Sequence, residues 1–268
     1  MSRSRITEKG RRKQGRGEGH GPDYSPWIKV GDYPSNVSFG SRFNGLVNGR
    51  PTNAMSLWES NLYLALERGE LTDIRENYPL SLEETLVLAS RLGFRHPVER
   101  KTGFPKALTV DYYTDARDED GRLINKAYDV KQKSHLAFDS VMREITIKEI
   151  YFQDHDTLYK VITQRPCDSV LGKNLFLLRR HSRQYLSVEH QREIRRMEKV
   201  LFKELANSRE PYAHVCLRLD HKYGYCLGTC LSTVYYLVYH RYWMVDLTEE
   251  VRPDEGPLKI KSRRAVEG

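Results

Sequence analysis

The chain alternates between segments in which apolar residues recur every three to four positions and shorter segments rich in β-branched and aromatic residues. The first pattern is typical of amphipathic helices and the second of strands. From these patterns we predict helices at 56–69, 81–93 and 134–154, and strands at 71–80, 108–114, 127–131 and 158–163. Helices alternating with strands in this order favour an α/β fold in which helices flank a central mixed sheet.

The pattern changes to mainly helical after residue 180. We predict helices at 187–206, 212–223 and 229–240, then a strand at 241–247 that pairs with 257–260 across a Pro-Asp-Glu-Gly turn. Three helices followed by a two-stranded hairpin resemble a winged helix, a module that binds either DNA or protein. We therefore divide the chain into an arm at 1–22, a first domain at 23–180 and a winged-helix-like domain at 181–268.

Two strands of the predicted sheet carry acidic residues that could lie close together. Asp111 is on one strand, and Asp129-Val-Lys131 closes the next, after a Gly-containing acidic turn. Side chains alternate along a strand, so Asp129 and Lys131 share one face while Val130 points to the other. Neighbouring carboxylates repel unless a divalent cation lies between them, and oxygen ligands suit Mg²⁺ or Mn²⁺. Lys131 could then orient an attacking water or stabilise charge on a phosphate.

This arrangement is the pattern of the PD-(D/E)xK nucleases, with Val110 where the pattern has Pro. A short Asp-x-Lys motif also arises by chance, so two solvated acids and a surface lysine remain the alternative. Glu59, on the helix that starts at Ser56, could be a further cation ligand. Ser56-x-x-Glu59 is also a capping box, in which the glutamate only stabilises the helix start.

The charge distribution favours a polyanionic partner. The formal net charge is +8 and the isoelectric point is near 9.2. Much of the excess lies in residues 1–22, which we interpret as a flexible basic arm on DNA. The residues assigned to DNA contact are Arg11, Arg12, Lys13, Arg16 and His20 in this arm, together with Lys133. No apolar run approaches the roughly 18 residues of a membrane span, and the sparse cysteines favour the cytoplasm.

Six ordered motifs resemble those of the TnsA family, the endonuclease subunits of heteromeric transposases. They are Gly15-Arg-Gly-x-Gly-His-Gly-x-Asp-Tyr-x-Pro-Trp27, Ser56-Leu-Trp-Glu59, Asp73-Ile-Arg-Glu-x-x-Pro79-Leu80, His96-Pro97-Val98, Asp111-Tyr112 and Val130-Lys131. The resemblance covers residues 15–180 well and the remainder loosely. Six motifs in order are far more specific than one Asp-x-Lys.

The resemblance implies a restriction-endonuclease-like first domain with Glu59, Asp111 and Asp129 as metal ligands and Lys131 as the catalytic lysine. Members of the family can carry Gln where this chain has Asp129. The family cuts the 5′ ends of a transposon, while an integrase-type transposase cuts the 3′ ends and an AAA+ ATPase controls both. The resemblance also places the chain in the bacterial cytoplasm, on nucleoid DNA when active.

Two other functions fit the same residues. The chain could be a stand-alone restriction or junction-resolving nuclease of the same fold, which would act without a partner. It could also be a non-catalytic adaptor that uses a nuclease-like domain to hold DNA and recruit partners. The presence of all four residues Glu59, Asp111, Asp129 and Lys131 argues against the adaptor, which has no use for a complete catalytic set.

Overall fold

The computed structural model describes residues 6–32, 40–99, 102–163, 169–182, 188–264 and 266. The chain divides into two compact units, Met1–Asp168 and Ser169–Gly268. No helix among the described residues is both long enough and apolar enough to cross a bilayer.

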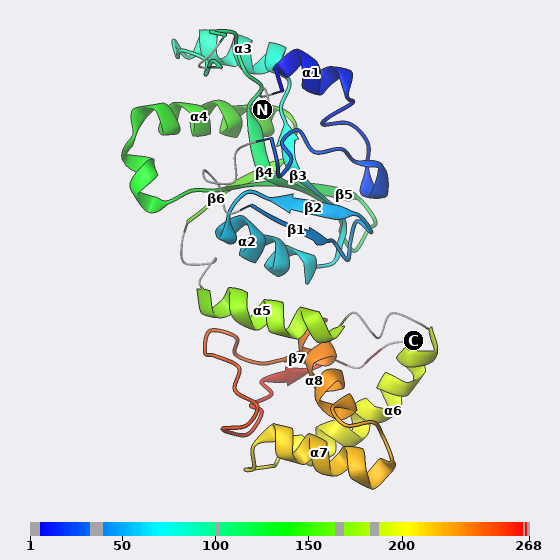
Figure 1. The fold of residues 1–268 in the computed structure, drawn as a ribbon. Coiled ribbons are helices and arrows are strands. Elements are labelled where there is room, and N and C mark those ends of the chain that lie inside the picture. The colour runs from blue at the N-terminus through cyan, green and yellow to red at the C-terminus, as the bar shows by residue number, and fades with distance from the viewer. Residues whose placement is uncertain are drawn as a thin grey trace, which may run out of the picture. The chain divides into compact units, whose positions relative to one another are not determined.

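A four-stranded sheet forms the centre of the first unit (Figure 1). Its strand order is β3 (Leu71–Pro79), β4 (Thr109–Arg117), β5 (Leu123–Val130) and β6 (Leu158–Ile162). The pairs β3–β4 and β4–β5 are antiparallel, whereas β5–β6 is parallel. Parallel neighbours require a crossover, which α4 (Asp139–Asp154) provides. The predicted mixed α/β sheet is therefore confirmed.

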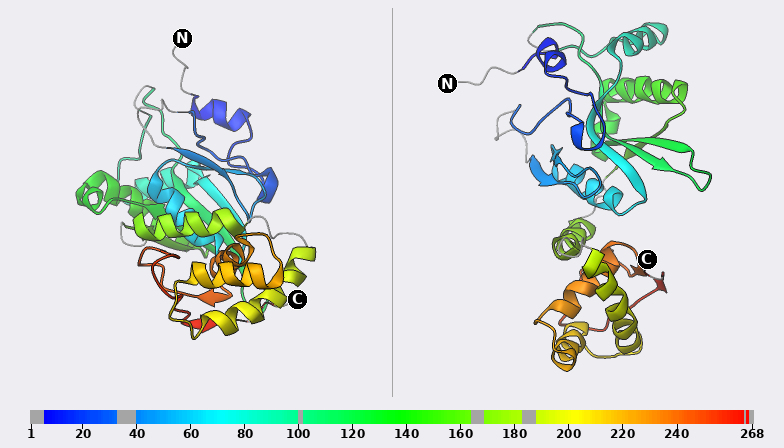
Figure 2. Two further views of the ribbon diagram at one scale, coloured as in Figure 1. Left: turned by 60° about the horizontal axis from the view of Figure 1, so that its bottom comes forward. Right: turned by 90° about the vertical axis from the view of Figure 1, so that its right-hand side faces the viewer.

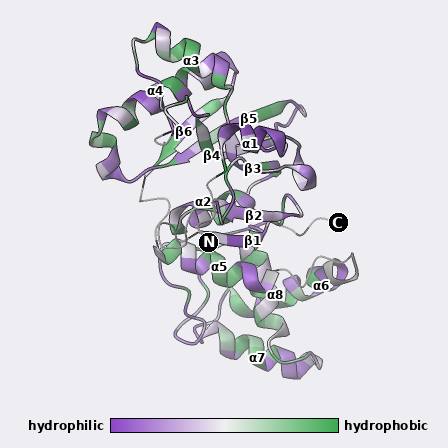
Figure 3. Cartoon of the chain, turned by 45° about the horizontal axis from the view of Figure 1, so that its top comes forward, coloured by the Kyte–Doolittle hydropathy of each residue, from purple (hydrophilic) through white to green (hydrophobic). Residues whose placement is uncertain are grey.

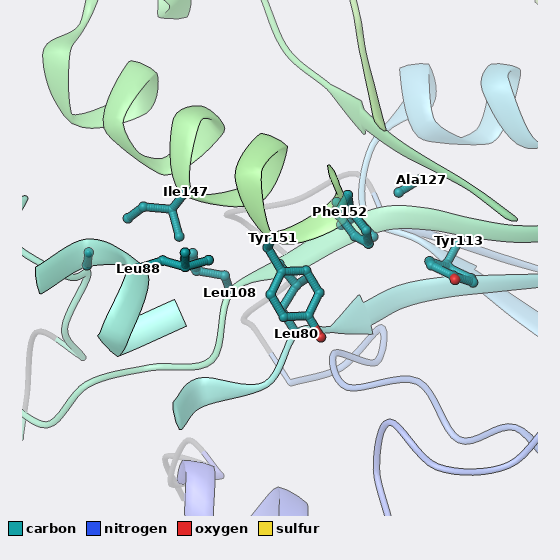
Figure 4. Close-up of a cluster of buried hydrophobic side chains, with 10 residues drawn as sticks. Leu80, Leu88, Leu108, Tyr113, Ala127, Ile147, Tyr151 and Phe152 are labelled. Atoms are coloured by element: carbon teal, nitrogen blue, oxygen red, sulfur yellow. The ribbon is translucent and has the colours of Figure 1, made fainter. Parts of the chain in front are cut away.

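Helices and a hairpin cover the two faces of this sheet, as two further views show (Figure 2). On one face, α3 (Leu82–Arg91) and α4 bury an apolar cluster, shown in Figure 4. On the other face, α2 (Leu57–Glu67) packs together with the hairpin of β1 (Ser41–Asn44) and β2 (Pro51–Ala54). The first cluster contains Leu80, Leu88, Leu108, Val110, Ile147 and Phe152, and the second contains Leu62, Tyr63, Ile74 and Tyr112.

The predicted helix starts are confirmed by their caps. Ser56 accepts a hydrogen bond from the backbone N–H of Glu59, and Ser81 accepts one from Glu84. The segment predicted as one helix at 134–154 is divided: a 3₁₀ turn, η2 (Lys133–Ala137), precedes α4. The strands at Asp111 and Asp129 extend further than predicted, because their pairing continues through polar residues to Arg117 and Leu123.

The basic N-terminal segment is not a flexible arm over its described residues. It forms α1 (Glu8–Lys13) and η1 (Gly21–Asp23), and Arg16 is buried against Asp32 with a shortest N–O distance of 2.5 Å. Glu8 accepts a hydrogen bond from the backbone N–H of Ala107. These contacts attach the segment to the first unit, and sequence patterns do not reveal them because the partners are distant. Residues 1–5 lie outside the described part of the chain.

The second unit is mainly helical, as predicted. It contains α5 (Ser169–Ser182), α6 (Val188–Leu205), α7 (Tyr212–Tyr223) and α8 (Thr229–Tyr239). Most of α8 is buried, in agreement with its hydrophobic colouring in Figure 3. A short ladder follows, β7 (Trp243–Met244) with β8 (Ser262–Arg263). The pairing predicted with 257–260 was thus wrong by a few residues, and the winged-helix assignment stays a prediction.

Candidate active site

Asp111 and Asp129 lie beside each other on adjacent strands. The β4–β5 register pairs Tyr112 with Tyr128, and one step further along it brings Asp111 next to Asp129. The backbone N–H of Val130 donates a 2.6 Å hydrogen bond to Asp111 Oδ2. The cross-strand meeting of the two predicted carboxylates is therefore present in the structure.

Lys131 follows β5 on the same side as Asp129. Its Nζ atom lies 3.9 Å from Asp129 Oδ1. Val130, between them, packs against the apolar cluster under α2, as the alternation of side chains requires. The backbone N–H of Lys131 donates to the carbonyl of Ile162 on β6. The lysine is thus held by a strand neighbour while its side chain remains 23% exposed.

Glu59 lies in the first turn of α2 and is 9% exposed. Its carboxylate accepts hydrogen bonds from the backbone N–H of Met55 and from the hydroxyl of Ser56, at 2.7 and 2.9 Å. The capping role considered from the sequence is therefore formed in this structure. Glu59 also lines the same cleft as Lys131, and its negative charge contributes to raising the pKa of Asp111. Glu59 consequently lies both at a helix start and at the edge of the acidic group.

The electrostatics of the three carboxylates differ sharply. Burial, together with the charges of Asp129 and Glu59, raises the pKa of Asp111 to about 8. Burial also raises the pKa of Glu59. Burial alone would raise the pKa of Asp129 as well, but Lys148 and Lys131 outweigh it and hold that pKa below its usual value. Lys148 and Lys131 therefore favour the charged form of Asp129, whereas burial disfavours the charged forms of Asp111 and Glu59. A cation bound among the three carboxylates would favour all three charged forms.

Sequence analysis did not identify Lys148 and Tyr159 as part of this group. Lys148 Nζ on α4 lies 2.7 Å from Asp129 Oδ2 and 2.9 Å from Glu144, and the hydroxyl of Tyr159 donates to Asp129 Oδ2 at 2.6 Å. One signal was available: Lys148 lies on the apolar stripe of its helix, beside the buried Ile145 and Phe152. A lysine at such a position requires a buried acidic partner.

A cleft of about 740 Å³ opens beside the candidate residues. Glu59 and Lys131 line it, together with the exposed His135 and Gln132. The rest of its lining is Ser41, Met55, Ser56, Leu57, Trp58, Ser60 and Val130. A ligand in this cleft would therefore have access to the lysine and to one of the three carboxylates.

The residues present fit a divalent cation. Carboxylate oxygens are the ligands that Mg²⁺ and Mn²⁺ prefer. Asp129 Oδ1 is buried and has no hydrogen-bond partner among the described residues, so one ligand atom is left available. Glu59, Asp111 and Asp129 would hold the cation. Their three carboxylate charges, more than Lys131 and Lys148 together balance, would supply its affinity.

A second acidic group lies elsewhere on the sheet. Ligand atoms of His20, Asp73 and Asp115 all lie within 4.8 Å of one another, the spacing of a possible metal site. Arg75, however, reaches both oxygens of Asp115 at 2.6 and 2.7 Å and lies 3.5 Å from Asp73. The buried guanidinium thus pairs with both carboxylates, and the backbone N–H of Gly21 donates to Asp73 Oδ2 at 3.0 Å. Asp73 Oδ1 has no hydrogen-bond partner among the described residues.

The structure separates the predicted DNA-binding residues into two groups. Arg11 and Arg16 are buried, Arg11 beside Glu8 at 3.0 Å and Arg16 beside Asp32. Both side chains have acidic partners within the fold. They are buried because α1 and the loop after it pack onto the domain, whereas the sequence had suggested an exposed arm. The side chains that remain exposed are those of Arg12, Lys13, His20 and Lys133.

The fold and the site define a class. A mixed sheet flanked by helices, with paired aspartates and a lysine at the end of two neighbouring strands, is a restriction-endonuclease-like domain. The family described as "TnsA endonuclease C terminal" matches residues 168–247. The "Transposon Tn7 transposition protein TnsA" of Escherichia coli is 28% identical over 223 residues, which are 83% of this chain and 79% of that protein. Over most of its length the chain is therefore similar to a TnsA protein.

Proposed function

We propose that this chain is the metal-dependent endonuclease subunit of a transposase and hydrolyses the phosphodiester at the 5′ ends of a transposon. The observation that carries the proposal is the meeting of Asp111, Asp129 and Lys131 where the start of β4 lies beside the end of β5, with Glu59 lining the same cleft as Lys131. The similarity to a transposition protein supports the substrate class.

Each residue has a distinct part in this reaction. Glu59, Asp111 and Asp129 hold Mg²⁺, or Mn²⁺ in its place. The bound cation would supply Lewis-acid polarisation of the scissile phosphate and a more acidic attacking water. Lys131 orients that water and stabilises negative charge on the phosphate oxygens. The exposed Arg12, Lys13, His20 and Lys133 contact the DNA backbone, where basic side chains position a protein without reading sequence.

Partners follow from the same proposal. A subunit that cuts one strand at each end needs an integrase-type transposase for the other strand and an AAA+ ATPase to control the pair. We propose residues 181–268, which lie within the second unit, as a winged-helix-like module for DNA or partner binding. We place the activity in the bacterial cytoplasm, on nucleoid DNA, since the similar protein belongs to a bacterium.

The test is strand cleavage by the purified chain, with and without its transposase, on DNA that contains a transposon end. In Mg²⁺ we expect a nick at the 5′ end that Asp111→Ala abolishes. The control is Asp120→Ala, which removes an exposed acid from the turn of the same hairpin. Both variants should give the circular dichroism spectrum of the unaltered chain.

Three results would contradict the proposal in different ways. Undiminished nicking by Asp111→Ala removes the catalytic site. Specific cleavage by the chain alone, without any transposase, favours a stand-alone nuclease. Binding of the DNA with no cleavage under any cation or partner condition favours the adaptor.

A further inference from the structure

We propose that Lys148 and Tyr159 are positioning residues that fix the Asp129 carboxylate so that only Oδ1 is presented to a divalent cation. This inference rests on the proposed function, in which Asp129 is a cation ligand. It adds two side chains that lie outside the ligand set and act through Asp129.

The two donors meet the same carboxylate oxygen. Lys148 Nζ lies 2.7 Å and the Tyr159 hydroxyl 2.6 Å from Asp129 Oδ2. Asp129 Oδ1 has no hydrogen-bond partner in the described part of the chain, although it is buried, and it points towards Lys131 at 3.9 Å. A carboxylate with one oxygen bonded twice and the other left unbonded has a fixed orientation. Outer hydrogen bonds of this kind orient metal ligands in proteins.

Lys148 is itself held rigidly. Its side chain is 1% exposed, and it contacts Glu144 at 2.9 Å in addition to Asp129. Both of its carboxylate partners are therefore in place before any ligand arrives. A lysine fixed in this way cannot reach the cleft, whereas the partly exposed Lys131 lines it. The two lysines beside Asp129 have different parts: Lys131 faces the substrate and Lys148 fixes the ligand.

Tyr159 offers a change that leaves the charge of the site untouched. Its ring stacks on Phe152 at 5.5 Å between centroids, and Tyr159→Phe keeps that ring while removing the donor to Asp129. Tyr151→Phe is the matched control, because this ring also packs on Phe152, at 5.3 Å, while its hydroxyl contacts the backbone of Ser81 instead.

The experiment titrates the full chain with Mn²⁺ and follows the free ion by electron paramagnetic resonance. We expect Tyr159→Phe to raise the dissociation constant about tenfold, the low end of the effect of outer-shell changes, and Tyr151→Phe to leave it unchanged. Thermal unfolding in EDTA should show equal, small losses for both variants. A dissociation constant for Tyr159→Phe equal to that of the unaltered chain would overturn the inference.

Lys148→Met provides a second test whose sign is diagnostic. Removing a positive charge near a cation should tighten Mn²⁺ binding by simple Coulomb attraction. Positioning predicts the opposite, because Asp129 is released. Weaker binding by folded Lys148→Met supports the inference, and unchanged or tighter binding overturns it. If this variant does not fold, Tyr159→Phe still decides the matter.

One further variant separates this inference from the proposed function. If Asp111→Asn abolishes Mn²⁺ binding while Tyr159→Phe binds normally, only the positioning role fails. Two results would contradict the cation site and therefore both proposals. One is that the unaltered chain binds no Mn²⁺. The other is that Asp111→Asn binds Mn²⁺ as tightly as the unaltered chain.

Discussion

Two acidic groups on one sheet differ in the counter-ions that surround them. Asp73 and Asp115 face each other on β3 and β4, and the buried Arg75 bridges them. Asp111, on the same strand as Asp115, has no arginine within its group, and its pKa rises to about 8 because of burial and of the charges of Asp129 and Glu59. Close spacing of ligand atoms alone would select the first group as a metal site. The raised pKa of Asp111, which reflects its burial and the neighbouring carboxylates, favours the second group instead.

The comparison shows how a protein distinguishes a structural acid from a functional one. A buried carboxylate that the fold itself neutralises contributes to a fixed structure. A buried group whose negative charge exceeds what the protein balances can depend on a ligand, which in the proposed function is a divalent cation.

The largest effect on stability should come from Arg75→Met. It leaves Asp73 and Asp115 buried without their counter-ion, so the free energy of unfolding should fall by about 3–5 kcal/mol. Urea denaturation measures it. Arg117→Met, at the exposed end of β4, removes a single hydrogen bond to the Gly121 carbonyl and should lower stability by about 1 kcal/mol or less. An Arg75→Met variant as stable as the unaltered chain would mean that these acids do not depend on the arginine.

Lys131→Met should change activity strongly and stability little, the reverse of Arg75→Met. We expect the rate of end cleavage to fall about 10²–10³-fold, because a charge that stabilises the transition state is lost. Stability should change by less than about 1 kcal/mol, since this lysine is partly exposed. Single-turnover cleavage and urea denaturation give the two values. The exposed Lys160→Met serves as the control, and a large stability loss in Lys131→Met would blur the contrast between the two groups.

Cation binding should stabilise the chain through one acidic group only. At a Mg²⁺ concentration one hundred times the dissociation constant, the gain should be about 2.7 kcal/mol. Asp111→Asn should abolish the gain in melting temperature on adding Mg²⁺, whereas Asp115→Asn should retain it, whatever its own starting stability. Loss of the gain in Asp115→Asn instead would reverse the assignment of the two groups.

The smallest expected effect on stability concerns the two roles of Glu59, as a helix cap and as a cation ligand. Ser56→Ala removes the cap of α2 and should cost about 1 kcal/mol, with cleavage reduced no more than a few-fold. Glu59→Gln should cost similar stability but lower cleavage about 100-fold or more, because a cation ligand is lost. If both variants cleave alike, Glu59 serves only the helix.

Sequence patterns predicted most of the first unit because its signals are local. Period-two alternation predicted that Asp129 and Lys131 share a face, and the capping boxes at Ser56 and Ser81 marked two helix starts. The cross-strand meeting of Asp111 with β5 followed from a short hairpin. Each of these inferences depends on residues close in sequence, so one chain sufficed.

The failures share the opposite property. Arg16 was interpreted as part of a free arm, yet it is buried against Asp32, and Lys148 was not noticed although it completes the surroundings of Asp129. Ion pairs of this kind join residues 16 and 19 positions apart. The charge of a side chain does not indicate which residue it will pair with in the folded chain. A basic segment can therefore form its ion pairs within its own domain and leave few charges for DNA.

The turn between β4 and β5 is closed by its own contacts. Asp118 accepts from the backbone N–H of Arg122 at 2.8 Å, and Arg117 donates to the carbonyl of Gly121. The tip requires nothing from the apolar core, and its residues are largely exposed. A fluorescent label at Glu119 should therefore leave folding undisturbed, at the opposite end of the strand from Asp111. The hairpin is a natural place for an optical reporter of assembly on DNA.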